Sequence, residues 1–202
     1  MSEILGPGKE EVWRKFAEEI NGKYIEGHYG QPDHIEVTHN KWTIIFDTYA
    51  VSNPFSSRHE NVGEFTIIKV PFYTRDSFQF SIREKGIING MGKLFGAQDI
   101  EIGDAAFDKK YIIKGNDENK LQLLLSNKKI LELIHFQKRI CLELVDDEGF
   151  WGTKLSDGVF EITFVATNVI KNMEQLRSLY NLFIELLNQL SHIGSVVDKE
   201  VV

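Results

Sequence analysis

Hydrophobic and polar positions alternate along several short segments of this chain. In residues 77–83, Phe78, Phe80 and Ile82 alternate with polar side chains, which predicts a strand with one buried and one solvated face. Similar patterns predict strands at 24–29, 34–39, 42–49 and 64–72, separated by Gly, Pro, Asn and Ser. An antiparallel meander fits this first series of strands best.

Elsewhere the hydrophobic positions recur at helical spacing. Val12, Trp13 and Phe16 share one side of a predicted helix at 9–20. A second helical stretch is predicted at 117–136, with Asn116 or Asp117 as its cap, and "SNKK" at 126–129 divides it. The longest predicted helix covers 172–192. Further strands are predicted at 110–114, 139–145 and 159–166.

These elements predict an α+β fold. We expect a large, mainly antiparallel sheet covered by the N-terminal helix, the central helical segment and the long C-terminal helix. The prediction is one domain over residues 1–202. A two-part organisation, 1–84 and 105–202 joined by the Gly-rich amphipathic segment 85–104, is the alternative.

The C-terminal helix is apolar over more than one side. A helix on a single sheet needs an apolar stripe of only about 100°, and leucines such as Leu179, Leu182 and Leu186 extend beyond it. A second helix of the same chain, a twin subunit or a ligand chamber would cover the rest. We therefore predict these leucines as partner-binding candidates in a homodimer, together with the loop aromatics Phe150 and Trp151.

An apolar, glycine-containing segment lies between residues 86 and 96. If this segment is helical, its apolar residues share one side. They are Ile87, Ile88, Met91, Leu94 and Phe95. Glycines at 90 and 92 weaken such a helix, so it needs an apolar surface to dock on. That surface is the protein's own core, a hydrophobic ligand for which these residues form a lid, or a membrane. Lys93 is its only cation, which disfavours the membrane.

Composition excludes several classes of partner. The 202-residue chain is 42% hydrophobic and 26% charged, which is ordinary for a globular protein. Its formal net charge of −7 and scattered basic residues argue against nucleic acid. The lone Cys141 cannot form an internal disulfide, and the N-terminus lacks a basic region followed by an apolar one. We therefore expect a cytoplasmic protein with no membrane span.

No reactive constellation is identified, so we predict no catalytic residues, no metal and no cofactor. The glycines near Lys93 match neither a P-loop nor a dinucleotide-binding fingerprint. His34 and His39 are five apart, so they face opposite sides of one strand. Asp99 and Glu101 are interpreted as the solvent side of a short strand, and Cys141 as a small packed side chain.

Two regions resemble a known group of proteins. Residues 85–125, with "KLFGAQDIEIGDAAFDKKYIIKGNDENKLQLLL", and the late "LRSLYNLFIELLNQLSHIGS" resemble a widespread group of uncharacterised bacterial proteins, a domain of unknown function. The resemblance implies no activity, cofactor or site. The residues favour a non-catalytic interaction or assembly module. The alternative is a binder or carrier of a small hydrophobic ligand, held between the sheet and the C-terminal helix.

Overall fold

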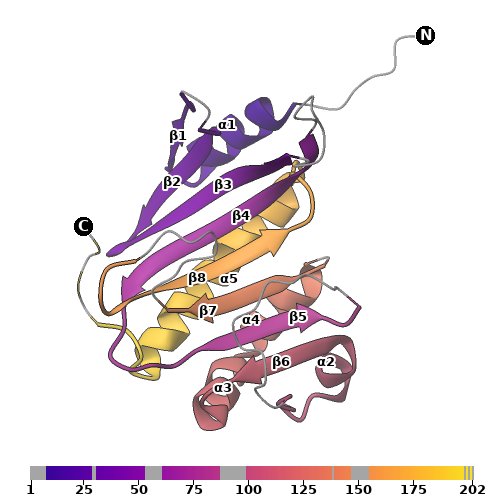
Figure 1. Ribbon diagram of the computed structural model, residues 1–202, viewed down its shortest axis with the longest axis vertical. Helices are drawn as coiled ribbons and strands as arrows, with labels where there is room; N and C mark the ends of the chain where they lie inside the picture. Colours follow the sequence, from indigo (N-terminus) through magenta and orange to yellow (C-terminus); the bar gives the residue numbers. More distant parts are fainter. Residues whose placement is uncertain are drawn as a thin grey trace.

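The computed structural model describes residues 8–28, 31–52, 61–86, 99–137, 139–146, 155–197, 199 and 201. Its strands are β1 (Lys23–Ile25), β2 (His34–His39), β3 (Trp42–Ser52), β4 (Asn61–Tyr73), β5 (Phe80–Glu84), β6 (Tyr111–Gly115), β7 (Cys141–Val145) and β8 (Val159–Ala166). Its helices are α1 (Lys9–Glu19), α2 (Ala105–Lys110), α3 (Glu118–Leu125), α4 (Lys128–Phe136) and α5 (Met173–His192) (Figure 1).

One sheet joins all eight strands in the order β1-β2-β3-β4-β8-β7-β5-β6, and neighbouring strands are antiparallel. The first four strands form the predicted meander. The chain then departs from it, because β8 pairs with β4 and places Phe164 opposite Ile68. The predicted α+β class, with a large antiparallel sheet, is therefore confirmed. The meander accounts for only half of that sheet.

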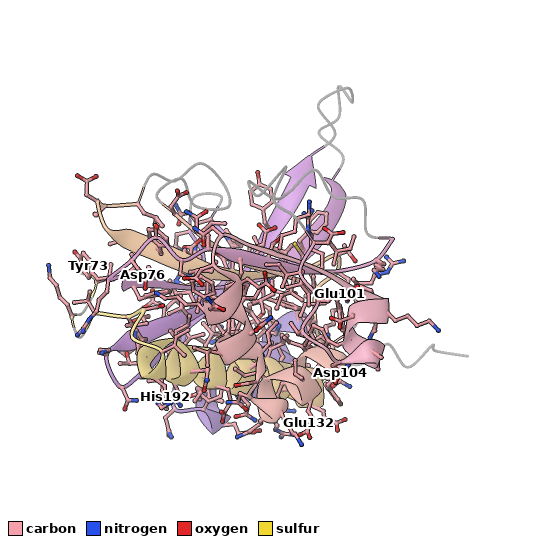
Figure 2. All side chains as sticks on the ribbon, turned by 90° about the horizontal axis from the view of Figure 1, so that it is seen from below. Tyr73, Asp76, Glu101, Asp104, Glu132 and His192 are labelled. Carbon is pink, nitrogen blue, oxygen red and sulfur yellow. The ribbon has the colours of Figure 1, made fainter. Side chains whose placement is uncertain are left out.

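The long helix lies on one side of the sheet. Figure 1 shows α5 crossing behind the strands, and Figure 2, turned by 90°, separates α5 from the plane of the strands. Strand side chains alternate between the two faces. On the helix-covered face Ile68, Phe164 and Leu142 have no exposed surface and belong to one hydrophobic cluster with the helices.

The first helix is anchored to both the N-terminal and the C-terminal half of the chain. The indole N–H of Trp13 donates a buried hydrogen bond to the carbonyl oxygen of Ile170, with an N···O distance of 2.9 Å. The Phe16 ring meets the Phe46 ring of β3 edge to face, with centroids 5.1 Å apart. Buried aromatic pairs of this kind add stability beyond the area that they bury. The contacts attach α1 to β3 and to the segment that precedes α5.

The apolar sides of α5 are covered within the chain. Its leucines Leu179, Leu182 and Leu186 are fully buried in the common hydrophobic cluster, where α5 contacts α1, α3 and α4 besides the sheet. The sequence left three candidates for covering the second apolar side of α5: another helix of the chain, a twin subunit or a ligand chamber. In the structure, other helices of the same chain cover it. The placement of the leucines is a correction to their choice as partner-binding candidates, because their side chains offer no exposed surface.

Side-chain caps fix where the helices begin. The side chains of Asp117, Asn127 and Asn172 accept backbone hydrogen bonds at the starts of α3, α4 and α5. Asn127 therefore divides the central helical stretch within the predicted "SNKK" sequence, and α5 ends before Gly194, whose φ is +79°. No described helix is long and apolar enough to cross a bilayer.

Some local predictions differ from the structure, most clearly around α2 and at the start of β5. A strand was expected around Asp99 and Glu101, but only an isolated bridge joins Asp99 to Lys114, and α2 follows. Asp104 begins this short helix by accepting hydrogen bonds from two backbone N–H groups. The strand expected at 77–83 begins only at residue 80, because the Asp76 carboxylate holds the N–H of Phe78 in a loop.

Removing a buried side chain of α5 tests its role in the core. We expect Leu182→Ala to lower the free energy of unfolding by about 2–5 kcal/mol, because it leaves a cavity in the core. The exposed neighbour Asn181→Ala is the matched control and should change stability by less than about 0.5 kcal/mol. Urea unfolding and solution mass are measured together. A Leu182→Ala protein with unchanged stability but fewer subunits would contradict the core assignment.

Candidate functional site

An open groove lies where α4 ends against the sheet and the start of α5. Its volume is about 780 Å³. We call it the corner groove. The lining comes from separate stretches of the chain and consists of Glu84, Lys110, His135, Phe136, Gln137, Arg139, Thr167, Asn168 and Gln175. Its size falls within the range of small-ligand and peptide sites.

The most apolar group of the corner groove is Phe136, the last residue of α4. Its exposed fraction is 47%, which makes it one of few large hydrophobic side chains at the described surface. The preceding His135 is held by aromatic neighbours. Its ring centroid lies 5.2 Å from that of Phe107 and 5.5 Å from that of Tyr111. Phe136 therefore extends from a fixed base rather than from a loose loop.

Gln137 connects this helix end to α5. Its Nε2 group donates to the carbonyl oxygen of Leu133 at 3.1 Å and to the Ser178 hydroxyl at 2.9 Å. Its Oε1 atom is buried and accepts no hydrogen bond within the described chain. An unpaired buried acceptor costs about 1–3 kcal/mol. The side chain thus positions the floor of the groove and leaves one acceptor unsatisfied there.

The opposite wall turns sharply at Arg139. This residue has a φ of +54°, in the left-handed region, and its N–H donates to the Glu84 carboxylate at 2.9 Å. A second bond runs from the N–H of Glu84 to the carbonyl oxygen of Ile140 at 3.2 Å. Both bonds tie the turn to the end of β5. The strained backbone aims the next strand into the sheet and leaves the guanidinium group outside.

The electrostatics of the corner groove are mainly cationic. Lys110 lies 5.0 Å from the centre of the Tyr111 ring, and within the ranges described neither Lys110 nor Arg139 forms an ion pair. Among the lining residues that the structure describes, Glu84 is the only carboxylate. Burial raises the pKa of the Tyr111 hydroxyl, so it stays neutral at physiological pH. These groups can bind an anionic group beside an apolar one.

None of the sequence-predicted site residues that the structure describes lies in the corner groove. The lid candidates Ile87, Ile88, Met91, Leu94 and Phe95, like Phe150 and Trp151, fall outside the described residues. Leu179, Leu182 and Leu186 lie in the core. The corner groove was missed because Phe136 fits the apolar pattern of its helix. The one available signal was the pair of cations Lys138 and Arg139, which follow Phe136 after Gln137.

A second feature lies on the sheet face that the helices leave uncovered. Cys141 and Glu143 of β7 point to this face, and both are buried. Burial and then the charge of Glu143 raise the pKa of the Cys141 thiol to about 12, which agrees with a packed, unreactive cysteine. Burial raises the pKa of Glu143 to about 7, although Arg83 and Cys141 oppose the shift. In the portion of the chain described, no three metal-ligating side chains converge.

Comparison with known proteins gives one structural relationship. No protein-family model and no curated protein matches the chain. It is similar to the crystal structure of the mycobacterial trehalose monomycolate transport factor A, TtfA, with a TM-score of 0.57 and 9% sequence identity. The similarity covers 95% of this chain and 99% of that chain. At this identity it shows the fold alone, and the resemblance of residues 85–125 to an uncharacterised bacterial group stays a prediction.

The buried carboxyl predicts a pH dependence of stability. The pKa of Glu143 is about 7 in the folded state against an ordinary 4.5, so between these pH values the folded chain binds a proton that the unfolded chain has lost. Stability therefore falls as pH rises from 4.5 to 7, by about 3 kcal/mol from this group. Glu143→Gln should remove that slope and stabilise the protein at pH 8.

The measurement is urea unfolding of both proteins between pH 4 and 8. The contributions of all other titrating groups to the free energy of unfolding cancel when the two proteins are compared. Glu101→Gln, at an exposed carboxyl, is the matched control. Parallel pH curves for the wild type and Glu143→Gln would show that Glu143 is ordinarily charged in the folded state.

Proposed function

We propose that this chain is a non-catalytic interaction module that binds an acidic segment of a partner protein in the corner groove. The observation that carries the proposal is the exposed Phe136 ring beside Lys110 and Arg139, two cations without an ion pair in the described residues. Aromatic and arginine side chains contribute most to protein interfaces. The lone Cys141 agrees with a cytoplasmic setting, which is part of the same proposal.

Charge complementarity defines the partner segment. An acidic residue can form a bidentate pair with the Arg139 guanidinium, and a neighbouring apolar side chain can cover Phe136. The chain as a whole carries a formal charge of −7. An acidic segment is therefore repelled by most of the surface and attracted at this groove, which favours one binding position over others.

A fixed groove lowers the cost of binding. The hydrogen bonds of Gln137 and Glu84 hold its floor and one wall before a partner arrives. Less side-chain entropy is then lost on association. The similar fold of the transport factor TtfA is compatible with a role in binding, although a fold alone does not set a function.

Peptide binding tests the proposal directly. The probe is a fluorescein-labelled ten-residue peptide in which glutamates flank two leucines, and its control has glutamine at each glutamate. We expect saturable binding of the acidic peptide by fluorescence anisotropy. Arg139→Glu and Phe136→Ala should each weaken it about tenfold or more. Lys23→Glu, on β1 at the far edge of the sheet, is the charge-matched control.

Either of two results would overturn the proposal: equal binding of both peptides, or acidic binding that Arg139→Glu leaves unchanged. Native mass spectrometry of freshly purified protein adds the number of subunits and any retained small molecule. If the protein is a dimer and Arg139→Glu dissociates it, the partner that binds the corner groove is a second copy of the chain. A retained lipid-sized mass would favour the ligand carrier instead.

A further inference from the structure

A row of polar side chains crosses the sheet on the face away from the helices. The register places Lys69 opposite Thr163, Thr163 opposite Glu143, Glu143 opposite Ser81, and Ser81 opposite Lys114. Directly opposed side chains on one sheet face lie about 5 Å apart. We call this set the polar row. Its three central members, on β8, β7 and β5, are at most 4% exposed.

Two atoms in the middle of the polar row accept and donate no hydrogen bond within the described chain. They are Oε1 of Glu143 and Oγ of Ser81. Their neighbour Thr163 cannot satisfy Glu143, because its hydroxyl donates to Glu161 at 3.0 Å. Buried polar groups are nearly always hydrogen-bonded, so two adjacent exceptions need an explanation. Leaving both unpaired is costly, since each loses its hydration.

The charges around this pair select the chemistry of a binding group. Lys69 and Lys114 lie at the two ends of the polar row, where they form ion pairs with Asp47 and Asp99. Arg83 is close enough to lower the pKa of Glu143, and a ligand ammonium group beside Glu143 would be repelled by this guanidinium group. A ligand carboxylate would meet Glu143 and the neighbouring Glu161, and a hydrocarbon would satisfy neither free atom. These exclusions leave a neutral ligand group that both donates and accepts a hydrogen bond.

We propose that Glu143 and Ser81 form a binding site for the hydroxyl group of a small neutral ligand. The hydroxyl donates to Oε1 of Glu143 and accepts from the Ser81 hydroxyl, so that both free atoms gain a partner. The apolar part of the ligand lies beside Cys141 and Val145, which are buried on the same face. This site and the corner groove share no residue, so the inference stands independently of the proposed function.

Solution NMR tests the site with a defined probe. Cyclohexanol carries one hydroxyl on an apolar ring, and methoxycyclohexane is the matched control without an O–H donor. We expect saturable, millimolar shifts at the amides of Ser81 and Glu143 with cyclohexanol only. Binding to buried atoms requires a local opening of this face, so the probe is used in excess. Ser81→Ala should weaken binding about fivefold or more.

The pKa of Glu143 gives a readout that nonspecific solvation would not move. A hydroxyl that donates to the carboxylate stabilises its charged form and lowers its pKa. The side-chain carboxyl ¹³C shift, followed against pH with and without cyclohexanol, should show that decrease, and Glu143→Gln should abolish the signal. Shifts that grow linearly with the probe, equal shifts with methoxycyclohexane, or an unchanged Glu143 pKa would each overturn the proposal.

Discussion

The antiparallel pairing of β4 with β8 is the constraint on which the remaining structure depends. It joins the meander of β1 to β4 to β8, which begins 86 residues after β4 ends, and through β8 to β7, β5 and β6 in one sheet. Ile68 and Phe164 meet at this seam, and α5 covers it. Both candidate sites follow from the seam, because it places β7 and β5 beyond β8 and so creates the polar row and the wall of the corner groove.

Periodic patterns predicted the longer elements, in which apolar side chains recur often enough to establish a period. The long helix was predicted at 172–192 and is observed as α5 at Met173–His192, and strands β2 and β8 agree with their predictions at both ends. Helix α2 was missed because its six residues bury only Phe107, which is too little to establish a period. Strand ends differ from the prediction where a side chain takes a backbone N–H group that the strand would otherwise use, as the Asp76 carboxylate does with the N–H of Phe78.

The candidate sites were harder to predict, for two physical reasons. The corner groove is assembled from the ends of several elements, and no spacing in the sequence reveals that Arg139 and Lys110 lie near Phe136. The polar row depends on register between strands. The sequence around Cys141 already placed Glu143 on the same side as the cysteine, but an alternating strand normally exposes that side. Burial of both faces of β7 came only from the structure.

The seam between β4 and β8 also determines when the molecule can form during synthesis. A ribosome that has completed β4 must add more than a hundred further residues before α5 is finished, which takes on the order of ten seconds at typical elongation rates. Until then the outer edge of β4 has unpaired backbone groups and an apolar face without its helix. The nascent meander is therefore a natural client for chaperones, and premature termination before β8 would yield an aggregation-prone fragment.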